Sequence, residues 1–292
     1  MPILAISLVL LSCFGHAAWN LLAKRRSDPV AALWRSLLLS VVLLAPFSLT
    51  FLLHAPGRWP DQVWYCLLTS SASQALYAYA LGRAYRCGDL SLAYPIARSA
   101  PLFVAVWALV WLGEPIDAAG GVGIVTVVVG AVLLSLPAGR QPRHAALART
   151  IGWAVLTALC TSVYSVADRA AMLQIPSGLG RTAYLHLEFF GMWAGLTLLV
   201  CRSRPWKEFA VRSERTAAVA IGVLQPLTYL LVLSALAMPD AGVSYVVALR
   251  QFSAVIGVVF GWRLLRESHG WMRLLSAVIM VVGLALVAAP RR

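Results

Sequence analysis

Residues 112–137 read LGEPIDAAGGVGIVTVVVGAVLLSLP, and residues 265–290 read LRESHGWMRLLSAVIMVVGLALVAAP. Each stretch contains a glutamate, Glu114 or Glu267, and runs without a gap through a valine-rich segment to a proline. The two glutamates lie 153 residues apart, and eight of the 26 aligned positions are identical. In membranes, a duplicated hydrophobic unit is typical of transporters whose substrate site lies between the two halves. The sequence therefore predicts two copies of one membrane unit.

The composition excludes an ordinary water-soluble surface, because 61% of the residues are hydrophobic, 12% are charged and the mean hydropathy is +0.81. A helix needs about 20 apolar residues to cross the hydrocarbon core. About ten segments meet this criterion, near 3–23, 31–53, 62–82, 91–113, 117–137, 150–170, 182–201, 216–237, 241–264 and 270–289. We predict an all-α polytopic membrane protein whose ten transmembrane helices form two five-helix repeats.

The first predicted repeat spans residues 1–138 and the second spans 150–292, with a linker at 139–149. Because each copy holds an odd number of helices, the second copy must insert upside down relative to the first. The loop charges agree with this inversion. Sixteen Lys and Arg residues lie in the odd-numbered loops, against five in the even-numbered loops and the tail. The positive-inside rule then places the odd loops in the cytoplasm of a bacterial inner membrane and both termini outside.

The net charge of +13 is read in the same way, as a topology signal rather than a nucleic-acid surface, because the basic residues cluster in short loops. The expected partners are therefore a small-molecule substrate and membrane lipids. The five cysteines are scattered and show no C-x-x-C pair, so we expect neither a disulfide framework nor a metal, and no cofactor. No H-E-x-x-H or nucleophile–base pattern appears, which argues against an enzyme. Two G-x-x-x-G motifs, at 191–195 and 257–261, permit close helix contact within a monomer or across a homodimer.

Four charged residues lie inside apolar segments, where a charge costs several kcal/mol unless it faces water or a partner: Arg35, Arg98, Glu188 and Arg250. Arg98 and Arg250 lie in the fourth helix of each copy, four or five residues after Tyr94 and Tyr245. Such a pair would converge on one cavity and favour a ligand that carries carboxylate or phosphate. The alternative is that both arginines pair internally, with Glu188 or with free carbonyls.

Other residues of the predicted site follow from the repeat and from depth in the membrane. Gln74 and Gln225 match in the third and eighth segments, and Trp19, Asn20 and Tyr77 lie deep enough to contact a ligand. Glu188 is the candidate for proton coupling or charge balance, together with Arg35 and His16, although Glu188 could equally be a fixed counter-ion and His16 a structural residue. Glu114 and Glu267 are interpreted as acidic boundary markers that favour a helix N-terminus rather than as ligand-binding groups.

Three stretches carry a family resemblance: residues 16–20 (HAAWN) with Lys24, residues 88–98 (GDLSLAYPIAR), and Leu112-Gly113-Glu114 with the glycine-bearing helix after it. They resemble the ten-helix EamA-type branch of the drug/metabolite transporter superfamily. The resemblance implies an inverted-repeat bundle in which helices one to four and six to nine surround a cavity, with helices five and ten outside. It also implies export or exchange of metabolites by alternating access.

Two departures from the pattern stand out. Pro95 and Pro101 fall on valine or alanine in the second copy, so the halves need not gate alike. Many relatives keep both termini in the cytoplasm, contrary to the charge count here. The sequence thus predicts a secondary active transporter of a small polar, anionic or zwitterionic metabolite, and the alternative is a lipid or lipid-carrier flippase of the same fold.

Overall fold

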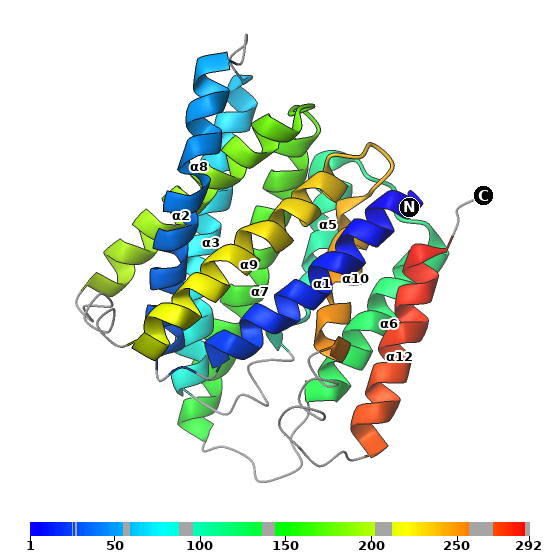
Figure 1. Ribbon diagram of the computed structural model, residues 1–292. Coiled ribbons are helices and arrows are strands. Elements are labelled where there is room, and N and C mark those ends of the chain that lie inside the picture. The colour runs from blue at the N-terminus through cyan, green and yellow to red at the C-terminus, as the bar shows by residue number, and fades with distance from the viewer. Residues whose placement is uncertain are drawn as a thin grey trace.

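The computed structural model describes residues 1–24, 26, 28–54, 59–87, 96–135, 144–201, 212–256 and 271–289. This part of the chain is helical apart from short connections (Figure 1). Its helices are α1 (Ile3–Lys24), α2 (Pro29–His54), α3 (Asp61–Cys87), α5 (Ala100–Leu112), α6 (Ala118–Ser135), α7 (His144–Met172), α8 (Gly178–Val200), α9 (Arg212–Leu236), α10 (Val243–Arg250) and α12 (Trp271–Ala288). The prediction of an all-α polytopic membrane protein is confirmed.

Five of the described helices are long and apolar enough to cross a membrane, namely those over residues 3–23, 30–54, 148–172, 178–200 and 214–236. Their outward faces are hydrophobic: Leu198 is 81% exposed and Leu52 is 76% exposed. In water such a surface would cause aggregation, whereas lipid tails solvate it at no cost. The exposed leucines therefore mark the surface that faces the bilayer.

The two copies interleave rather than lying side by side as separate bundles. Helix α1 packs against α9, α3 against α7, α2 against α8 and α6 against α12. Each of these pairs joins one helix of the first copy to one of the second. Exchanging the copies turns the α1–α9 pair into the α7–α3 pair and leaves the other two pairs unchanged, as a twofold relation between inverted repeats requires.

Helices α6 and α12 correspond to the two quoted stretches and lie next to each other at one edge of the bundle (Figure 1). Their close contact depends on glycines. A Cβ atom on Gly283 would lie 2.7 Å from the backbone nitrogen of Val127, and one on Gly130 would lie 2.8 Å from that of Met280. Because Gly130 and Gly283 lie 153 residues apart, the two copies use the same position to bring their backbones together.

The fourth helix of each copy is interrupted, and this positions the arginines. Ahead of α5, residues 96–97 are helical and residues 98–99 form a turn, while α10 ends at Arg250 and a further helical stretch covers residues 252–256. Pro101 accompanies the first interruption, but the equivalent residue beyond the second is Ala254. The fourth segment of each copy is thus interrupted within the described residues, at 98–99 and at 251, with a proline nearby in the first copy and without one in the second.

Glu114 caps a helix, although not the next helix along the chain. Its Oε2 atom accepts a hydrogen bond of 2.8 Å from the backbone N–H of Val243 at the start of α10, and its Oε1 atom lies 2.6 Å from Nε of Arg169. The same arginine donates to the carbonyls of Leu236, Met238 and Pro239. Glu114 therefore ties the first copy to the second at the ends of α5, α7 and α9. Glu267 lies outside the described residues.

Candidate substrate cavity

A cavity lies among α1, α3, α7, α8, α9 and α10, so both copies contribute to its walls. The cavity has a volume of about 50 Å³. This volume holds roughly three to five water molecules. Its lining is mixed, with Phe189, Met192 and Val232 among the apolar residues. The polar residues of the lining are Ser12, Cys13, His16, Trp19, Gln74, Tyr77, Tyr164, Gln225, Thr228, Tyr229 and Arg250.

Six of the residues predicted for the site meet in this cavity: His16, Trp19, Gln74, Tyr77, Gln225 and Arg250. Gln74 and Gln225 come from α3 and α9, which occupy the same place in the two copies. Two buried polar atoms on the lining, Nε1 of Trp19 and Oε1 of Gln225, have no hydrogen-bond partner among the described residues. A buried donor and acceptor without partners are costly, so they indicate a site that a polar molecule completes.

Arg250 brings a positive charge to the cavity wall. Its guanidinium lies 5.4 Å from the centre of the Tyr229 ring, a cation–π contact that fixes the direction of the side chain. Within the described part of the chain, no carboxylate forms an ion pair with Arg250. The alternative in which Glu188 neutralises this arginine therefore does not describe the structure.

Arg98 is half-buried and donates a hydrogen bond of 2.9 Å from Nη1 to Oε1 of Gln251. These two residues lie 153 positions apart, the same offset as Glu114 and Glu267, so equivalent places of the two copies meet at the two helix interruptions. Arg98 is not among the residues that line the cavity, yet both it and Arg250 lie close enough to act electrostatically on Cys13 and His16. Both arginines thus act on the same two residues of the cavity lining, and of the two only Arg250 lines the cavity.

Two predicted residues lie elsewhere, and a third is not among the described residues. Tyr245 is buried away from the cavity, where its hydroxyl accepts a hydrogen bond from the backbone N–H of Asp117 at 3.3 Å and its ring packs on Gly120. Asn20 is half-buried and donates to the carbonyl of His16 at 2.8 Å without lining the cavity. Tyr94 falls outside the described residues.

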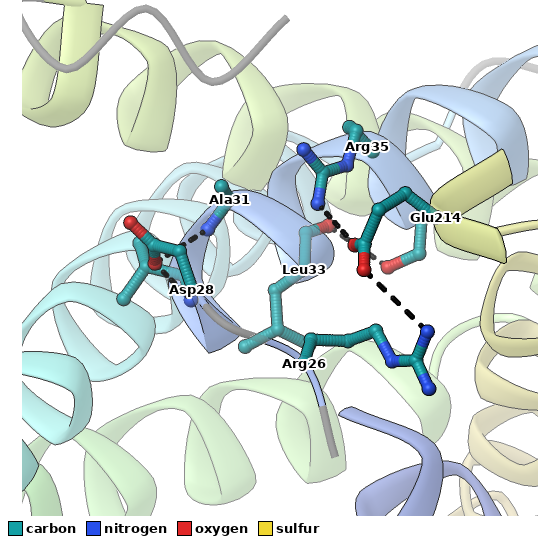
Figure 2. A network of polar contacts seen from close by, with 8 residues as sticks. Arg26, Asp28, Ala31, Leu33, Arg35 and Glu214 are labelled. Atoms are coloured by element: carbon teal, nitrogen blue, oxygen red, sulfur yellow. Dashed lines mark hydrogen bonds and ion pairs between the residues drawn. The ribbon is translucent and has the colours of Figure 1, made fainter. Parts of the chain in front are cut away.

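Arg35 is fully buried and lies at another level of the bundle. Its Nη2 atom is 2.8 Å from Oε2 of Glu214, at the start of α9, and Nη1 of Arg26 approaches the other oxygen of the same carboxylate at 3.4 Å (Figure 2). Asp28 caps α2 beside them through the backbone N–H groups of Val30 and Ala31. Arg35 is therefore the partner of Glu214 and not the counter-ion of Glu188.

Glu188 is also fully buried, and two neutral side chains donate hydrogen bonds to it. Ser70 donates to its Oε1 atom at 2.6 Å, and Nε2 of Gln74 donates to the same atom. This approach of α8 to α3 is possible because Gly191 and Gly195 face Ser71 and Ala75 at distances that leave no room for a Cβ atom. The G-x-x-x-G motif at 191–195 thus makes a contact within the chain.

Asp168 completes this cluster and was not among the predicted site residues. It is fully buried on α7, its carboxylate accepts hydrogen bonds from Tyr184 at 3.0 Å and from Tyr229, and its side chain interacts directly with that of Glu188. The sequence interpretation ended the sixth segment at residue 170, which put Asp168 at a boundary. Since no glycine or proline follows until Pro176, the helix continues and carries Asp168 into the interior.

The helical period could have found other lining residues. Ser12, His16 and Trp19 are spaced four and three residues apart, and Tyr229 lies four residues after Gln225. Residues at these spacings share one face of a helix. Arg250 and Tyr245 are five apart, a spacing that puts them on different faces of α10, which is why the tyrosine points away.

Comparison with known proteins now bears on this arrangement. A model of the EamA-like transporter family matches residues 3–136 and 148–289. The chain belongs to the EamA-like transporter family. A protein from Sinorhizobium sp. described as an uncharacterized transporter in the cobO 3′ region is 26% identical over 106 residues, which cover 36% of this chain and 75% of that protein.

The fold of this EamA-like protein also has a solved counterpart. A protein known from its crystal structure superposes with a TM-score of 0.73 over 97% of each chain at 17% identity, which shows a shared fold. The resemblance drawn from residues 16–24, 88–98 and 112–114 is confirmed by the family match. The protein is accordingly a multi-pass membrane protein of a transporter family, and the chemistry of its cavity bears on what it moves.

Proposed function

We propose that this EamA-like protein is a secondary active transporter that moves a small polar, anionic or zwitterionic metabolite through the cavity by alternating access. The observation that carries the proposal is the cationic side chain of Arg250 on the cavity wall, without a carboxylate partner among the described residues. Planar guanidinium groups bind carboxylate and phosphate in bidentate fashion. Nε1 of Trp19 adds a donor beside it, and Oε1 of Gln225 adds an acceptor that suits an ammonium or hydroxyl group.

The size of the cavity supports alternating access. Room for a few waters does not admit a metabolite, so the walls have to separate before a substrate enters. The walls come from both copies, and the helix interruptions at Arg98 and Gln251 meet at the contact between them. A movement of one copy against the other would therefore open the cavity and change the surroundings of both arginines.

A ligand screen of the purified protein tests the proposal. We expect one class among amino acids, phosphonates, sugar phosphates and nucleotides to raise the thermal unfolding midpoint. Loss of a charge-assisted hydrogen bond costs about 1.5–3 kcal/mol, so Arg250→Gln should lower the affinity for that ligand by roughly ten- to a hundredfold. Arg149→Gln, on an exposed arginine early in α7, is the matched control and should leave binding unchanged.

Transport in proteoliposomes decides between a solute carrier and a flippase. Uptake of the stabilising ligand by wild-type protein, lost in Arg250→Gln, supports the proposal. Uptake by Arg250→Gln at the wild-type rate would contradict the proposed role of Arg250 in binding the substrate. Translocation of a fluorescent phospholipid without solute uptake would favour the flippase instead.

We further propose that the odd-numbered loops lie in the cytoplasm of a bacterial inner membrane and that both termini lie outside. Support comes from the excess of Lys and Arg in the odd loops, and the start of α1 and the end of α12 lie at the same end of the bundle, as one side of the membrane for both requires (Figure 1). A phosphatase reporter fused after Arg292 should be active in the periplasm. A fluorescent protein that folds only in the cytoplasm and is bright at the same position would reverse the orientation.

A further inference from the structure

The two buried carboxyl groups beside the cavity have an incomplete set of hydrogen bonds. Asp168 is satisfied as an anion, because one oxygen accepts from Tyr184 and the other from Tyr229. Glu188 is not: its Oε1 atom accepts from Ser70 and Gln74, but its buried Oε2 atom has no partner among the described residues. A buried carboxylate oxygen without a donor is costly. A proton on Oε2, directed at Asp168, would remove that cost.

The charges facing the pair point to the same conclusion. The titratable groups around Asp168 and Glu188 are neutral ones, with Cys66 on α3, Tyr184 on α8 and Tyr229 on α9. Tyr164 on α7 and Arg250 on α10 act electrostatically on Tyr229, and Arg250 lies against its ring. No cation touches either carboxyl group within the described residues. Two like charges in contact inside a membrane cannot both be sustained, as in the carboxyl dyads of acid proteases.

Two side chains contact both the carboxyl pair and the cavity. Gln74 lines the cavity and donates to Glu188, while Tyr229 donates to Asp168 and carries Arg250 on its ring. A change of charge on the pair therefore acts electrostatically on the same side chains that would hold a ligand.

From this geometry we propose that Asp168 and Glu188 share a single proton and form the proton-binding site of the transporter, which makes the proton its coupling ion. Coupling of this proton to transport rests on the proposed transport function. Proton binding by the pair can be measured without a substrate. Deprotonation breaks the O–H bond at Oε2 of Glu188, leaves two negative charges on the pair, and passes the proton to water in the adjoining cavity.

The direction of coupling follows from electrostatics. An anion bound at Arg250 disfavours a second negative charge nearby, and the deprotonated pair competes with that anion for Arg250. Anion binding and proton binding therefore favour each other, and the effect is reciprocal. The pair would accordingly move a proton in the same direction as an anionic substrate.

Infrared difference spectroscopy of the full-length protein in lipid tests the proposal, with protons as the probe. Protonated carboxyl groups have a carbonyl stretch that carboxylates and amides lack. We expect wild-type protein at neutral pH to show this band, to lose it as the pH is raised, and to shift it in D₂O. Glu188→Gln should abolish the band and Asp168→Asn should shift it, whereas Asp61→Asn, on an exposed residue at the start of α3, should leave it unchanged.

Each result has a definite meaning. A wild-type spectrum without the band at neutral pH, or a band that survives unchanged in both Glu188→Gln and Asp168→Asn, overturns the shared proton. Loss of the band on adding NaCl but not choline chloride would identify a sodium site and also overturn it. If Glu188→Gln fails to fold, the shift in Asp168→Asn still decides. A ligand screen without a hit would count against the transport proposal and leave the spectroscopic result intact.

Discussion

Arg35 in the first copy and Glu188 in the second lie 153 residues apart, so they occupy the same place in the two repeats. Both side chains are fully buried, but one is a base and the other an acid, and their polar groups have different partners. Arg35 pairs with Glu214 on α9, while Glu188 meets Ser70 and Gln74 on α3 and the second carboxyl group of Asp168. One repeat fold thus keeps a permanent ion pair on one side and a site that can gain or lose a proton on the other.

The contrast suggests how a duplicated scaffold acquires direction. Equivalent packing, such as α2 on α9 and α3 on α8, preserves the geometry in both copies. The charges placed on that packing need not match, since each is neutralised locally by residues of the neighbouring helix. An ion pair holds its two helices together, whereas a carboxyl pair that shares one proton changes its charge when that proton leaves.

The largest expected effect comes from removing the partner of Arg35. Glu214→Gln leaves a buried guanidinium without its carboxylate, which costs about 3–5 kcal/mol. Glu188→Gln replaces a protonated carboxyl by a neutral amide of the same shape and should cost less than about 1 kcal/mol. The measurement is unfolding of the detergent-solubilised variants, followed by circular dichroism over a denaturant series.

Arg26→Gln is the matched control for this comparison, because Arg26 is partly exposed and contacts Glu214 at the longer distance of 3.4 Å. Its loss should cost about 0–1 kcal/mol. Equal destabilisation by Glu214→Gln and Glu188→Gln would show that Glu188 is an ionised group with a fixed partner, and the contrast between the copies would fail.

The sequence predicts the helical scaffold better than it predicts the residues of the site. Helices α6 and α12 were located by aligning Glu114 with Glu267, because the backbone contact needs glycine at Gly130 and Gly283 and therefore constrains both copies. The site depends on which side of a helix a residue faces and on where a helix ends. Tyr245 was misplaced for the first reason and Asp168 was missed for the second. Hydrogen-bond partners such as Glu214 for Arg35 lie far apart in sequence, so no local pattern reveals them.

An intermediate effect is expected where the copies are alike. A methyl group at Gly130 or Gly283 meets backbone atoms within 3 Å, so Gly130→Ala and Gly283→Ala should each destabilise the protein by about 1–3 kcal/mol, by similar amounts. At Gly152, where nothing lies within 4 Å of an added Cβ, alanine should stabilise by up to about 1 kcal/mol through helix propensity. Thermal unfolding of the three variants provides the measurement. A marked inequality between the first two would show that the α6–α12 contact is less symmetric than its glycines indicate.

The smallest effect is a shift of the infrared titration, and it concerns both tyrosines that donate to Asp168. Tyr184→Phe and Tyr229→Phe each remove one hydrogen bond that stabilises the carboxylate form of Asp168, so each should make the pair harder to deprotonate. Only Tyr229 lines the cavity and lies under Arg250, and phenylalanine keeps that ring. Each tyrosine donates one hydrogen bond to Asp168, so we expect both variants to move the infrared titration to higher pH by similar amounts. The pH dependence of ligand affinity should move with the titration in both variants. A shift in the titration without a shift in ligand affinity would mean that the carboxyl pair and the cavity are not coupled, because linked equilibria must change together.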